Sequence, residues 1–312
     1  MSDLLFTANT VAPLLLLMSV GFFARQIGLL NDSLVKGINQ LIFKIFLPVN
    51  LCYSVLNTPY DTELSGVAFL LIPLGTTLLF AMLFLIIPRL EKDRSKIGVL
   101  IQGCARSNYA FFGIPLVAML FPGQDTSLAA LLLVVTVPFY NVYSVIALSV
   151  YGGKEVKLGR ILLNILKNPL IIACLLGYVL WMFRFQPPSF LKTTMNDISK
   201  LSTPLALFTL GGAIRFSNAK KHIRQLAIGI SGKLFIAPLI FVTIGALLGL
   251  RDVALASVYI AFGAPTAVSS FPMAQQMGGD GELAAEQVAM SSTVSIISTF
   301  IFVFVMKTLG LV

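Results

Sequence analysis

Long apolar stretches separated by short polar breaks make up most of this chain of 312 residues. An apolar stretch of about 20 residues is long enough to cross the bilayer core as a helix, so the pattern predicts ten membrane-spanning helices. Lys44 and Pro48 interrupt the second span and Pro204 the seventh, so either could be a broken helix. The expected spans are roughly residues 7–27, 37–57, 65–88, 97–120, 127–151, 164–183, 196–214, 225–249, 253–275 and 284–306.

Two of these spans contain the same short pattern near their middles. It reads Phe112-Gly113-Ile114-Pro115 in the fourth span and Phe262-Gly263-Ala264-Pro265 in the ninth. Proline removes a backbone donor and glycine loosens the helix, so each span is expected to split into two half-helices. Broken backbone inside a membrane is tolerated where it lines a cavity, and matched breaks in two halves of a chain are typical of a carrier's substrate site.

The spans also match each other in order. Pro73 in the third span corresponds to Pro238 in the eighth, and the inner prolines of the second and seventh spans correspond as well. The sequence therefore predicts an all-α polytopic membrane protein of two five-helix repeats, residues 1–157 and 158–312, in one membrane unit. Because five spans is an odd number, the second repeat is expected to be inverted.

Composition excludes a soluble globular protein. Hydrophobic residues make up 57% of the chain, charged residues only 11%, and the mean hydropathy is +0.92. The start, Met1-Ser2-Asp3, lacks the basic region of a signal peptide, so the first span is expected to remain. The three cysteines stand apart inside predicted spans with no CxxC spacing, so we expect neither a disulfide framework nor a metal site.

Basic residues predict the orientation. If both termini lie outside, the cytoplasmic loops hold most of the lysines and arginines, and the opposite loops hold only Arg184, Lys192, Arg251 and Lys307. By the positive-inside rule, the chain is a multi-pass protein of the cytoplasmic, or inner, membrane. The net charge of +9 then reflects these loops and anionic lipid, and nucleic acid is not an expected partner.

Charges inside the predicted spans are basic. Lys44, Arg106 and Lys233 fall well within spans, and no acidic residue does. Buried cations usually face a cavity, a partner or backbone carbonyls, and an anionic ligand fits this pattern. Arg106 is the best candidate to attract a carboxylate; snorkelling to the cytoplasmic face or bonding to carbonyls is the alternative. Lys44 and Lys233 are expected to be structural or interfacial.

The amino ends of half-helices offer unpaired backbone N–H groups, which bind carboxylates without a cationic side chain. Amides at the breaks, with polar side chains beside them, are therefore candidate ligands. Asn50, Gln102 and Gln275 are expected instead to hydrogen-bond between helices. The predicted substrate-binding residues are Asn108, Arg106, Gly113, Ile114, Pro115, Gly263, Ala264, Pro265, Thr266 and Ser269.

Two segments resemble a known family. Residues 108–116, Asn-Tyr-Ala-Phe-Phe-Gly-Ile-Pro-Leu, resemble the fourth-span signature of the auxin efflux carrier family. Residues 264–268, with Met273-Ala274 and Gly278-Gly279-Asp280, are similar to the ninth-span signature of its bacterial members, the PIN-like and malate or malonate permease-type transporters. The likeness covers the whole chain, without the long cytoplasmic loop of many plant members.

The resemblance implies ten spans, an inverted repeat, crossing broken helices four and nine, a homodimer and organic-anion transport. It also implies that Asn108 lies in the substrate site and adds Asn141, which could instead bridge helices. Family members are associated with auxin, malate or malonate, so no particular substrate is implied.

The function expected is secondary active or potential-driven transport of a small organic carboxylate by alternating access, with an elevator-like movement. A sodium-coupled symporter of the bile-acid-carrier type is an alternative, and a channel or receptor is another. Carboxylate-based proton coupling is disfavoured, since no acidic residue is expected deep in a span and His222 lies in a loop. No HExxH pattern, intramembrane aspartate pair or P-loop is present, so the chain is not expected to be an enzyme or to need a cofactor, sodium apart.

Overall fold

The computed structural model describes residues 13, 16–57, 65–121, 124, 126–152, 167–213 and 222–312. Within these residues the chain is almost entirely helical, and the extended pairing is a single isolated bridge. The predicted all-α class is therefore confirmed. Five stretches in the described part are long and apolar enough to cross a membrane: Asp32–Leu56, Gly66–Leu90, Leu128–Tyr151, Ile223–Leu247 and Gly281–Thr308.

The described helices follow the predicted spans closely, and residues 16–26 are also helical. In chain order the named elements are α2 (Asp32–Leu41), η1 (Ile42–Phe46), α3 (Leu47–Leu56), α4 (Gly66–Leu90), α5 (Arg94–Ala105), η2 (Tyr109–Gly113), α6 (Ile114–Leu120), α7 (Ser127–Leu131), α8 (Leu133–Tyr151), α10 (Pro169–Met182), α11 (Ser189–Ala213), α12 (Ile223–Ser231), η4 (Gly232–Ile236), α13 (Ala237–Leu247), α14 (Asp252–Gly263), α15 (Ser270–Gln276) and α16 (Gly281–Thr308).

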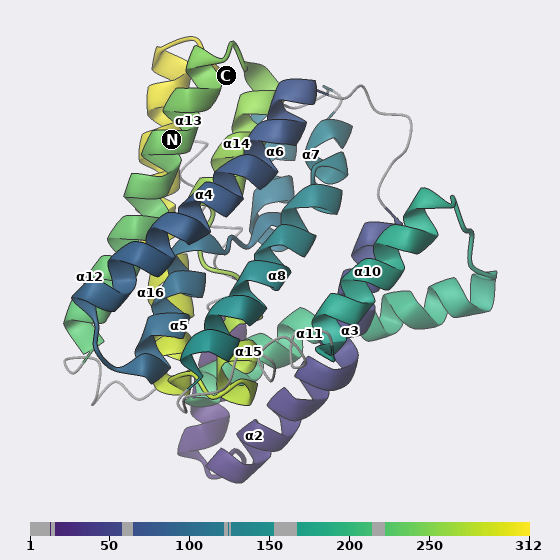
Figure 1. Cartoon of the computed structure of the whole chain (residues 1–312). Coiled ribbons are helices and arrows are strands. Elements are labelled where there is room, and N and C mark those ends of the chain that lie inside the picture. Colours follow the sequence, from purple (N-terminus) through teal and green to yellow (C-terminus); the bar gives the residue numbers. More distant parts are fainter. Residues whose placement is uncertain are drawn as a thin grey trace.

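The helices form two groups that lie beside each other (Figure 1). The larger group contains α4 to α8, α12 to α14 and α16, standing side by side. The smaller group contains α2, η1, α3, α10 and α11, with α3 packed against both α10 and α11. The short helix α15 contacts α5 and α16 of the larger group and α2 and η1 of the smaller one, so it lies where the groups meet.

Glycines let helices approach closely in the smaller group. A Cβ atom on Gly21 would lie 1.9 Å from the carbonyl oxygen of Phe208, and one on Gly211 would lie 1.9 Å from that of Met18. The helix over residues 16–26 and α11 therefore meet backbone to backbone, as small residues allow in membrane bundles.

Three prolines follow five-residue π-helical segments instead of breaking their helices. Pro48, Pro115 and Pro238 each stand second in an α-helix, directly after η1, η2 and η4. In each case the residue before the proline donates its N–H to the carbonyl five residues earlier, as Leu47 does to Ile42. In this wider turn the residue before the proline still finds a backbone acceptor, although the proline itself has no N–H to donate. The second span is therefore continuous from Asp32 to Leu56. In the seventh span, α11 also runs through Pro204.

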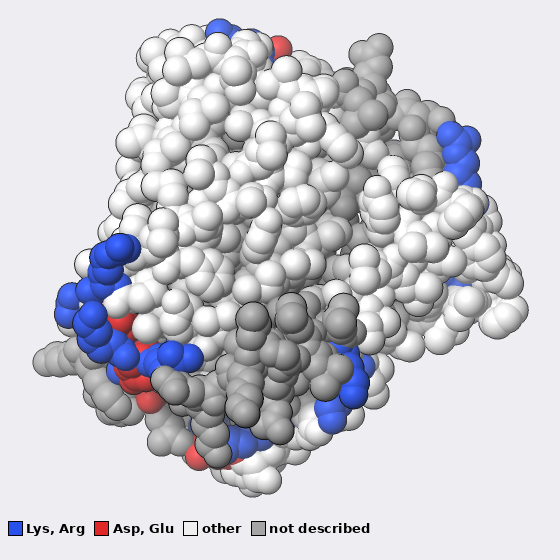
Figure 2. Space-filling model, viewed as in Figure 1, with Lys and Arg blue, Asp and Glu red and all other residues white. Residues whose placement is uncertain are grey.

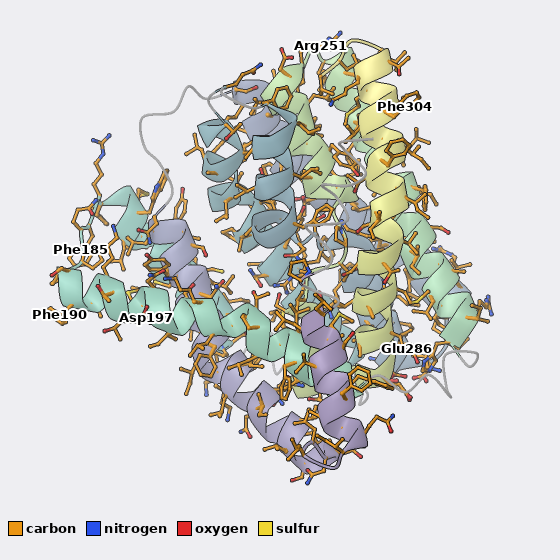
Figure 3. All side chains as sticks on the ribbon, turned by 180° about the vertical axis from the view of Figure 1, so that it is seen from behind. Phe185, Phe190, Asp197, Arg251, Glu286 and Phe304 are labelled. Carbon is orange, nitrogen blue, oxygen red and sulfur yellow. The ribbon has the colours of Figure 1, made fainter. Side chains whose placement is uncertain are left out.

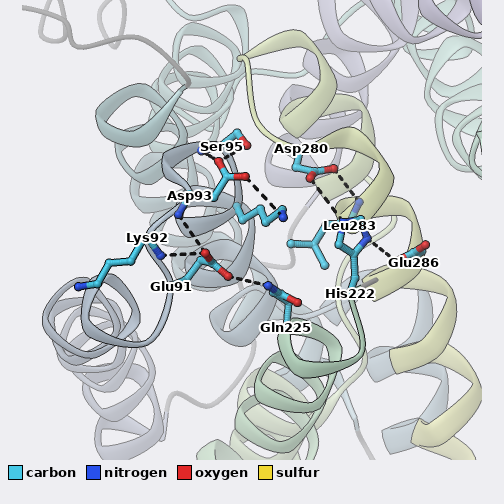
Figure 4. A network of polar contacts seen from close by, with 10 residues as sticks. Glu91, Lys92, Asp93, Ser95, His222, Gln225, Asp280, Leu283 and Glu286 are labelled. Atoms are coloured by element: carbon cyan, nitrogen blue, oxygen red, sulfur yellow. Dashed lines mark hydrogen bonds and ion pairs between the residues drawn. The ribbon is translucent and has the colours of Figure 1, made fainter. Parts of the chain in front are cut away.

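Charged side chains gather toward the ends of the larger group, and its surface between them is uncharged on the face shown in Figure 2. At one end, Glu91 accepts hydrogen bonds from the backbone N–H groups of Lys92 (2.8 Å) and Asp93 (2.9 Å) and from the side-chain amide of Gln225 (2.6 Å; Figure 4). Burial raises the pKa of the Glu91 carboxyl, but these hydrogen bonds outweigh it and hold the pKa below its ordinary value. This contact ties the α4–α5 turn to α12.

Candidate functional site

Both predicted breaks exist, but one lies elsewhere than expected. The ninth span stops being α-helical after Gly263 and resumes at Ser270, so Pro265 lies in the break as predicted. The fourth span instead stops at Ala105 and resumes at Tyr109. The expectation that Phe112-Gly113-Ile114-Pro115 is the break is wrong, because the π-helical segment η2 carries the helix through that sequence.

The two broken segments pair with each other directly. Ser107 and Thr266 form an isolated antiparallel bridge. On one side of it, the N–H of Asn108 donates to the carbonyl of Pro265 (2.8 Å), and on the other the N–H of Ala267 donates to the carbonyl of Arg106 (3.3 Å). The crossing therefore satisfies backbone groups that a break inside an apolar protein would leave unpaired.

Hydroxyl groups satisfy the carboxyl ends of the two half-helices across the crossing. The Ser107 hydroxyl donates to the carbonyl of Ala261 near the end of α14 (2.5 Å), and the Tyr140 hydroxyl donates to the same carbonyl. The Thr266 hydroxyl donates to the carbonyl of Gly103 near the end of α5 (2.9 Å). Each break thus supplies a side chain that caps the helix of the other break.

A cavity of about 60 Å³ lies at this crossing, between the larger and the smaller group. That volume has room for a few water molecules or a small carboxylate. The smaller group lines it from α3 and α11, and the larger group from α8 and the two broken segments. The described lining residues are Leu47, Asn50, Leu51, Ser54, Arg106, Ser107, Asn108, Tyr109, Ala110, Leu133, Val137, Tyr140, Asn141, Ser202, Thr203, Ala267, Val268 and Ser269.

Arg106 brings a positive charge to this cavity. The residue is only 4% exposed, so its side chain does not snorkel to the surface. Its guanidinium donates to the hydroxyl of Ser269 (2.7 Å) and to the sulfur of Met273. No carboxylate in the described residues forms an ion pair with it. A buried guanidinium held by neutral atoms retains its affinity for an anion.

Two asparagines add neutral hydrogen-bonding groups. The side-chain nitrogen of Asn108 is buried with no hydrogen-bond partner among the described residues. Asn141 donates to the carbonyl of Val137 (2.8 Å), while its side-chain oxygen has no such partner. Both residues line the cavity, so a bound molecule would find one open donor and one open acceptor there.

The structure brings four of the predicted site residues together at the cavity: Arg106, Asn108, Asn141 and Ser269. Six others are not among the described lining residues: Gly113, Ile114, Gly263, Ala264, Pro265 and Thr266. The side chain of Pro115 lies outside the part of the chain that the structure describes.

Close packing and backbone pairing explain why four of these residues do not line the cavity. The two glycines serve close packing, since a Cβ atom on Gly113 would lie 2.8 Å from Ile260 and one on Gly263 would lie 2.6 Å from the Tyr259 ring. Pro265 and Thr266 are occupied in the crossing itself.

The amino ends of the resumed helices still border the cavity, although different residues provide them. Tyr109 and Ala110 begin η2, and Ala267 to Ser269 lead into α15, and all of these line the cavity. Helix amino ends therefore border this cavity at residues 108–110 and 267–269, and a substrate site there stays a prediction.

Sequence reasoning missed the contribution of the smaller group. Asn50 was expected to bridge helices, and its side-chain nitrogen does donate to the hydroxyl (2.9 Å) and carbonyl (3.1 Å) of Ser199. It also lines the cavity, together with Ser202 and Thr203 of α11. Polar residues in apolar spans were a usable signal, but nothing in the sequence says which of them converge.

One acidic residue is buried close to the start of the last predicted span, residues 284–306. Glu286 on α16 is only 4% exposed, and its carboxylate lies 2.9 Å from a ring nitrogen of His222 (Figure 4). The residue lies toward the end of α16 away from Arg251 (Figure 3). The pair therefore belongs to the charged end of the larger group and not to the cavity. Lys44 is exposed on η1, in agreement with an interfacial role.

Comparison with known proteins agrees with a membrane carrier. The family described as membrane transport protein matches residues 6–158 and again 154–303. An uncharacterized transporter of Methanothermobacter thermautotrophicus is 23% identical, covering 94% of this chain and 96% of its own length. An uncharacterized transporter of Methanocaldococcus jannaschii is 21% identical, covering 93% and 95%. A Rhizobium meliloti protein provisionally named a malonate transporter is 23% identical, covering 92% and 91%.

Proposed function

The chain belongs to the membrane transport protein family, and from that premise we propose that it carries a small organic carboxylate across the cytoplasmic membrane. The protein is a transporter and not an enzyme. The observation that carries the proposal is Arg106, a buried cation beside a cavity with no described carboxylate to neutralise it. A substrate carboxylate supplies the missing negative charge.

The cavity suits a short acid. A cavity of about 60 Å³ has room for an anion of a few carbon atoms. In the binding mode we propose, Arg106 and the Asn108 amide donate to carboxylate oxygens, and Asn141 faces the remainder of the molecule. The name of the Rhizobium meliloti relative makes malonate the first candidate to test.

The proposed transport cycle is alternating access by movement of one helix group past the other. The cavity is lined from both groups, so displacement of the larger group would open it toward one side of the membrane. The mutual capping by Ser107 and Thr266 supports an inverted repeat of residues 1–157 and 158–312 with both broken helices in the moving part. The distribution of basic residues supports both termini outside.

Flux into proteoliposomes tests this function. Purified protein is reconstituted with and without a membrane potential, and uptake of labelled malonate, malate and indole-acetate is compared with that of their neutral amides. We expect potential-sensitive uptake of the short acids and none of the amides. Equal uptake of an acid and its amide would refute an anion site.

Asn108→Ala provides the test at a single residue. Removal of the unpaired amide is expected to abolish flux without loss of folding, because its nitrogen has no protein partner among the described residues to lose. Asn57→Ala, at an exposed helix end, is the matched control. Unchanged flux in Asn108→Ala would remove this residue from the site.

A further inference from the structure

Lys233 is a second buried cation, and the proposed substrate site does not use it. It lies on η4 in the middle of the stretch Ile223–Leu247 and is 0% exposed. It is not among the described residues that line the cavity. Such a charge inside an apolar protein is costly unless its surroundings are built for it.

The surroundings of this ammonium are three oxygen atoms. Its nitrogen donates to the carbonyl of Ala105 (3.1 Å), to the carbonyl of Phe262 (3.0 Å) and to the hydroxyl of Ser107. An ammonium group has three N–H donors and no acceptor, so all its hydrogen-bonding capacity is used. No described carboxylate pairs with it, so neutral oxygens alone offset the charge.

The two carbonyls belong to the carboxyl ends of the broken helices. Ala105 is the last residue of α5, and Phe262 is the last but one of α14. Carbonyls at such ends lack helical partners and carry the negative end of the helix dipole. Two helix ends that would repel each other therefore meet on one positive charge, which also contacts Ser107 of the bridge between Ser107 and Thr266.

Unwound carbonyls, half-helix carboxyl ends and a hydroxyl are also the ligands with which carriers coordinate a monovalent coupling cation. We propose that the Lys233 ammonium takes the place of such a cation, so that the crossing is held together without sodium. The side chain then acts as a positioning residue, because it fixes the end of α5, from which the segment of Arg106 and Asn108 departs, to the end of α14. This inference rests on the proposed function only for its flux measurement.

The two halves of the chain differ at this point. When Pro73 is matched with Pro238, the position of Lys233 corresponds to Ala68, a buried residue with no charge. One lysine from the second half therefore serves both helix ends, and the described structure contains no symmetric counterpart from the first half.

Thermal unfolding of the purified protein tests the inference. Melting temperatures are compared in choline, sodium, potassium and methylammonium chloride at equal ionic strength. The matched control is Lys44→Ala, since Lys44 also lies on a five-residue π-helical segment but is exposed. Wild type and Lys44→Ala are expected to melt at the same temperature in all four salts.

Lys233→Ala is expected to melt about 5–10 °C lower in choline, because two buried carbonyls lose their partner. Sodium or methylammonium should restore its melting temperature saturably, as a ligand that binds the vacated oxygens would. A merely structural lysine would show the loss without cation-specific recovery, and that result would overturn the inference. Saturable stabilisation of wild type by sodium would overturn it equally.

A second measurement decides the matter if Lys233→Ala and Lys233→Gln fail to fold in every salt. Wild-type flux is then measured in sodium-free liposomes. Full flux in choline supports the inference, and an absolute requirement for sodium overturns it. If wild type carries no tested anion, the proposed function fails, and salt-independent melting of wild type still reports on the lysine separately.

Discussion

Arg106-Ser107-Asn108 in the first break lies opposite Pro265-Thr266-Ala267 in the second, and each tripeptide gives one backbone hydrogen bond to the other. Only the central residues are alike, each with a hydroxyl that caps the opposite helix. The outer residues differ, since a guanidinium faces alanine and an amide faces proline. The crossing thus depends on the hydroxyls of Ser107 and Thr266, while the residues on either side of them are free to differ and to serve substrate binding.

The two halves of the chain therefore contribute different groups to the crossing and the cavity. To the cavity lining, the first break contributes Arg106, Ser107 and Asn108, and the second contributes Ala267, Val268 and Ser269. In return, the second half supplies Lys233, which stabilises both helix ends. The charged and polar side chains at the crossing are therefore distributed unequally between the two breaks, and under the proposed function this inequality would orient a small anion.

After the loss of flux expected for Asn108→Ala, the largest expected effect comes from removing the charge of Arg106. Arg106→Gln should lower the transport efficiency for malonate about 10- to 100-fold, because hydrogen bonds to a charged group contribute about 1.5–3 kcal/mol. Arg106→Lys should retain part of the activity, since it keeps the charge and loses the fork of donors. Initial rates in proteoliposomes over a range of substrate concentrations measure both.

Arg251→Gln is the control for this comparison, because Arg251 lies at the far end of the molecule and bonds to backbone carbonyls (Figure 3). Its rates should match wild type. If Arg106→Gln also matched wild type, the positive charge would not be the source of anion affinity.

The sequence predicted the two interrupted spans because glycine and proline act locally. It misplaced the first interruption because whether Pro115 breaks the helix depends on the turn before it. The π-helical turn η2 precedes Pro115 and lets the helix continue although the proline has no N–H to donate. Arg106-Ser107-Asn108 carried a subtler signal, since serine and asparagine favour helix starts and compete with helical hydrogen bonds. A polar tripeptide within an apolar span would have located the break.

The rest of the site depends on tertiary contacts. Asn50 and Ser202 are far apart in the chain and join Asn141 at the cavity only because α3, α8 and α11 converge there. Periodicity reports which residues are apolar, and in a membrane protein it does not tell which polar residues face each other. The burial of Glu286 was missed for the same reason, because its partner His222 comes from another element.

A second prediction sharpens the comparison at the shared centre. The Ser107 oxygen both donates to Ala261 and accepts from Lys233, whereas the Thr266 hydroxyl donates to Gly103 alone. Ser107→Ala should therefore cost about 2–3 kcal/mol of stability and Thr266→Val about 1 kcal/mol. Thermal unfolding in detergent gives the order of the two losses.

Thr194→Val serves as the reference for these substitutions. The Thr194 hydroxyl donates to the carbonyl of Phe190 on an exposed part of α11, so its removal should change stability very little. Equal losses for Ser107→Ala and Thr266→Val would mean that the contact with Lys233 adds nothing, and the two breaks would then be equivalent at their centres.

The smallest expected effect on transport concerns Gly113 and Gly263, which hold matching places in the sequence pattern but lie on opposite sides of the breaks. Alanine at Gly263 would press on the Tyr259 ring and on Pro238 (3.0 Å), and alanine at Gly113 on the Ile260 side chain. Because both contacts are packing contacts away from the cavity lining, each substitution should cost about 1–2 kcal/mol of stability and leave the KM for malonate unchanged. Gly37→Ala, where a Cβ atom meets nothing within 4 Å, should instead keep or slightly raise stability. A several-fold rise in KM for Gly113→Ala with normal folding would return that glycine to the binding site and shift the site toward Pro115.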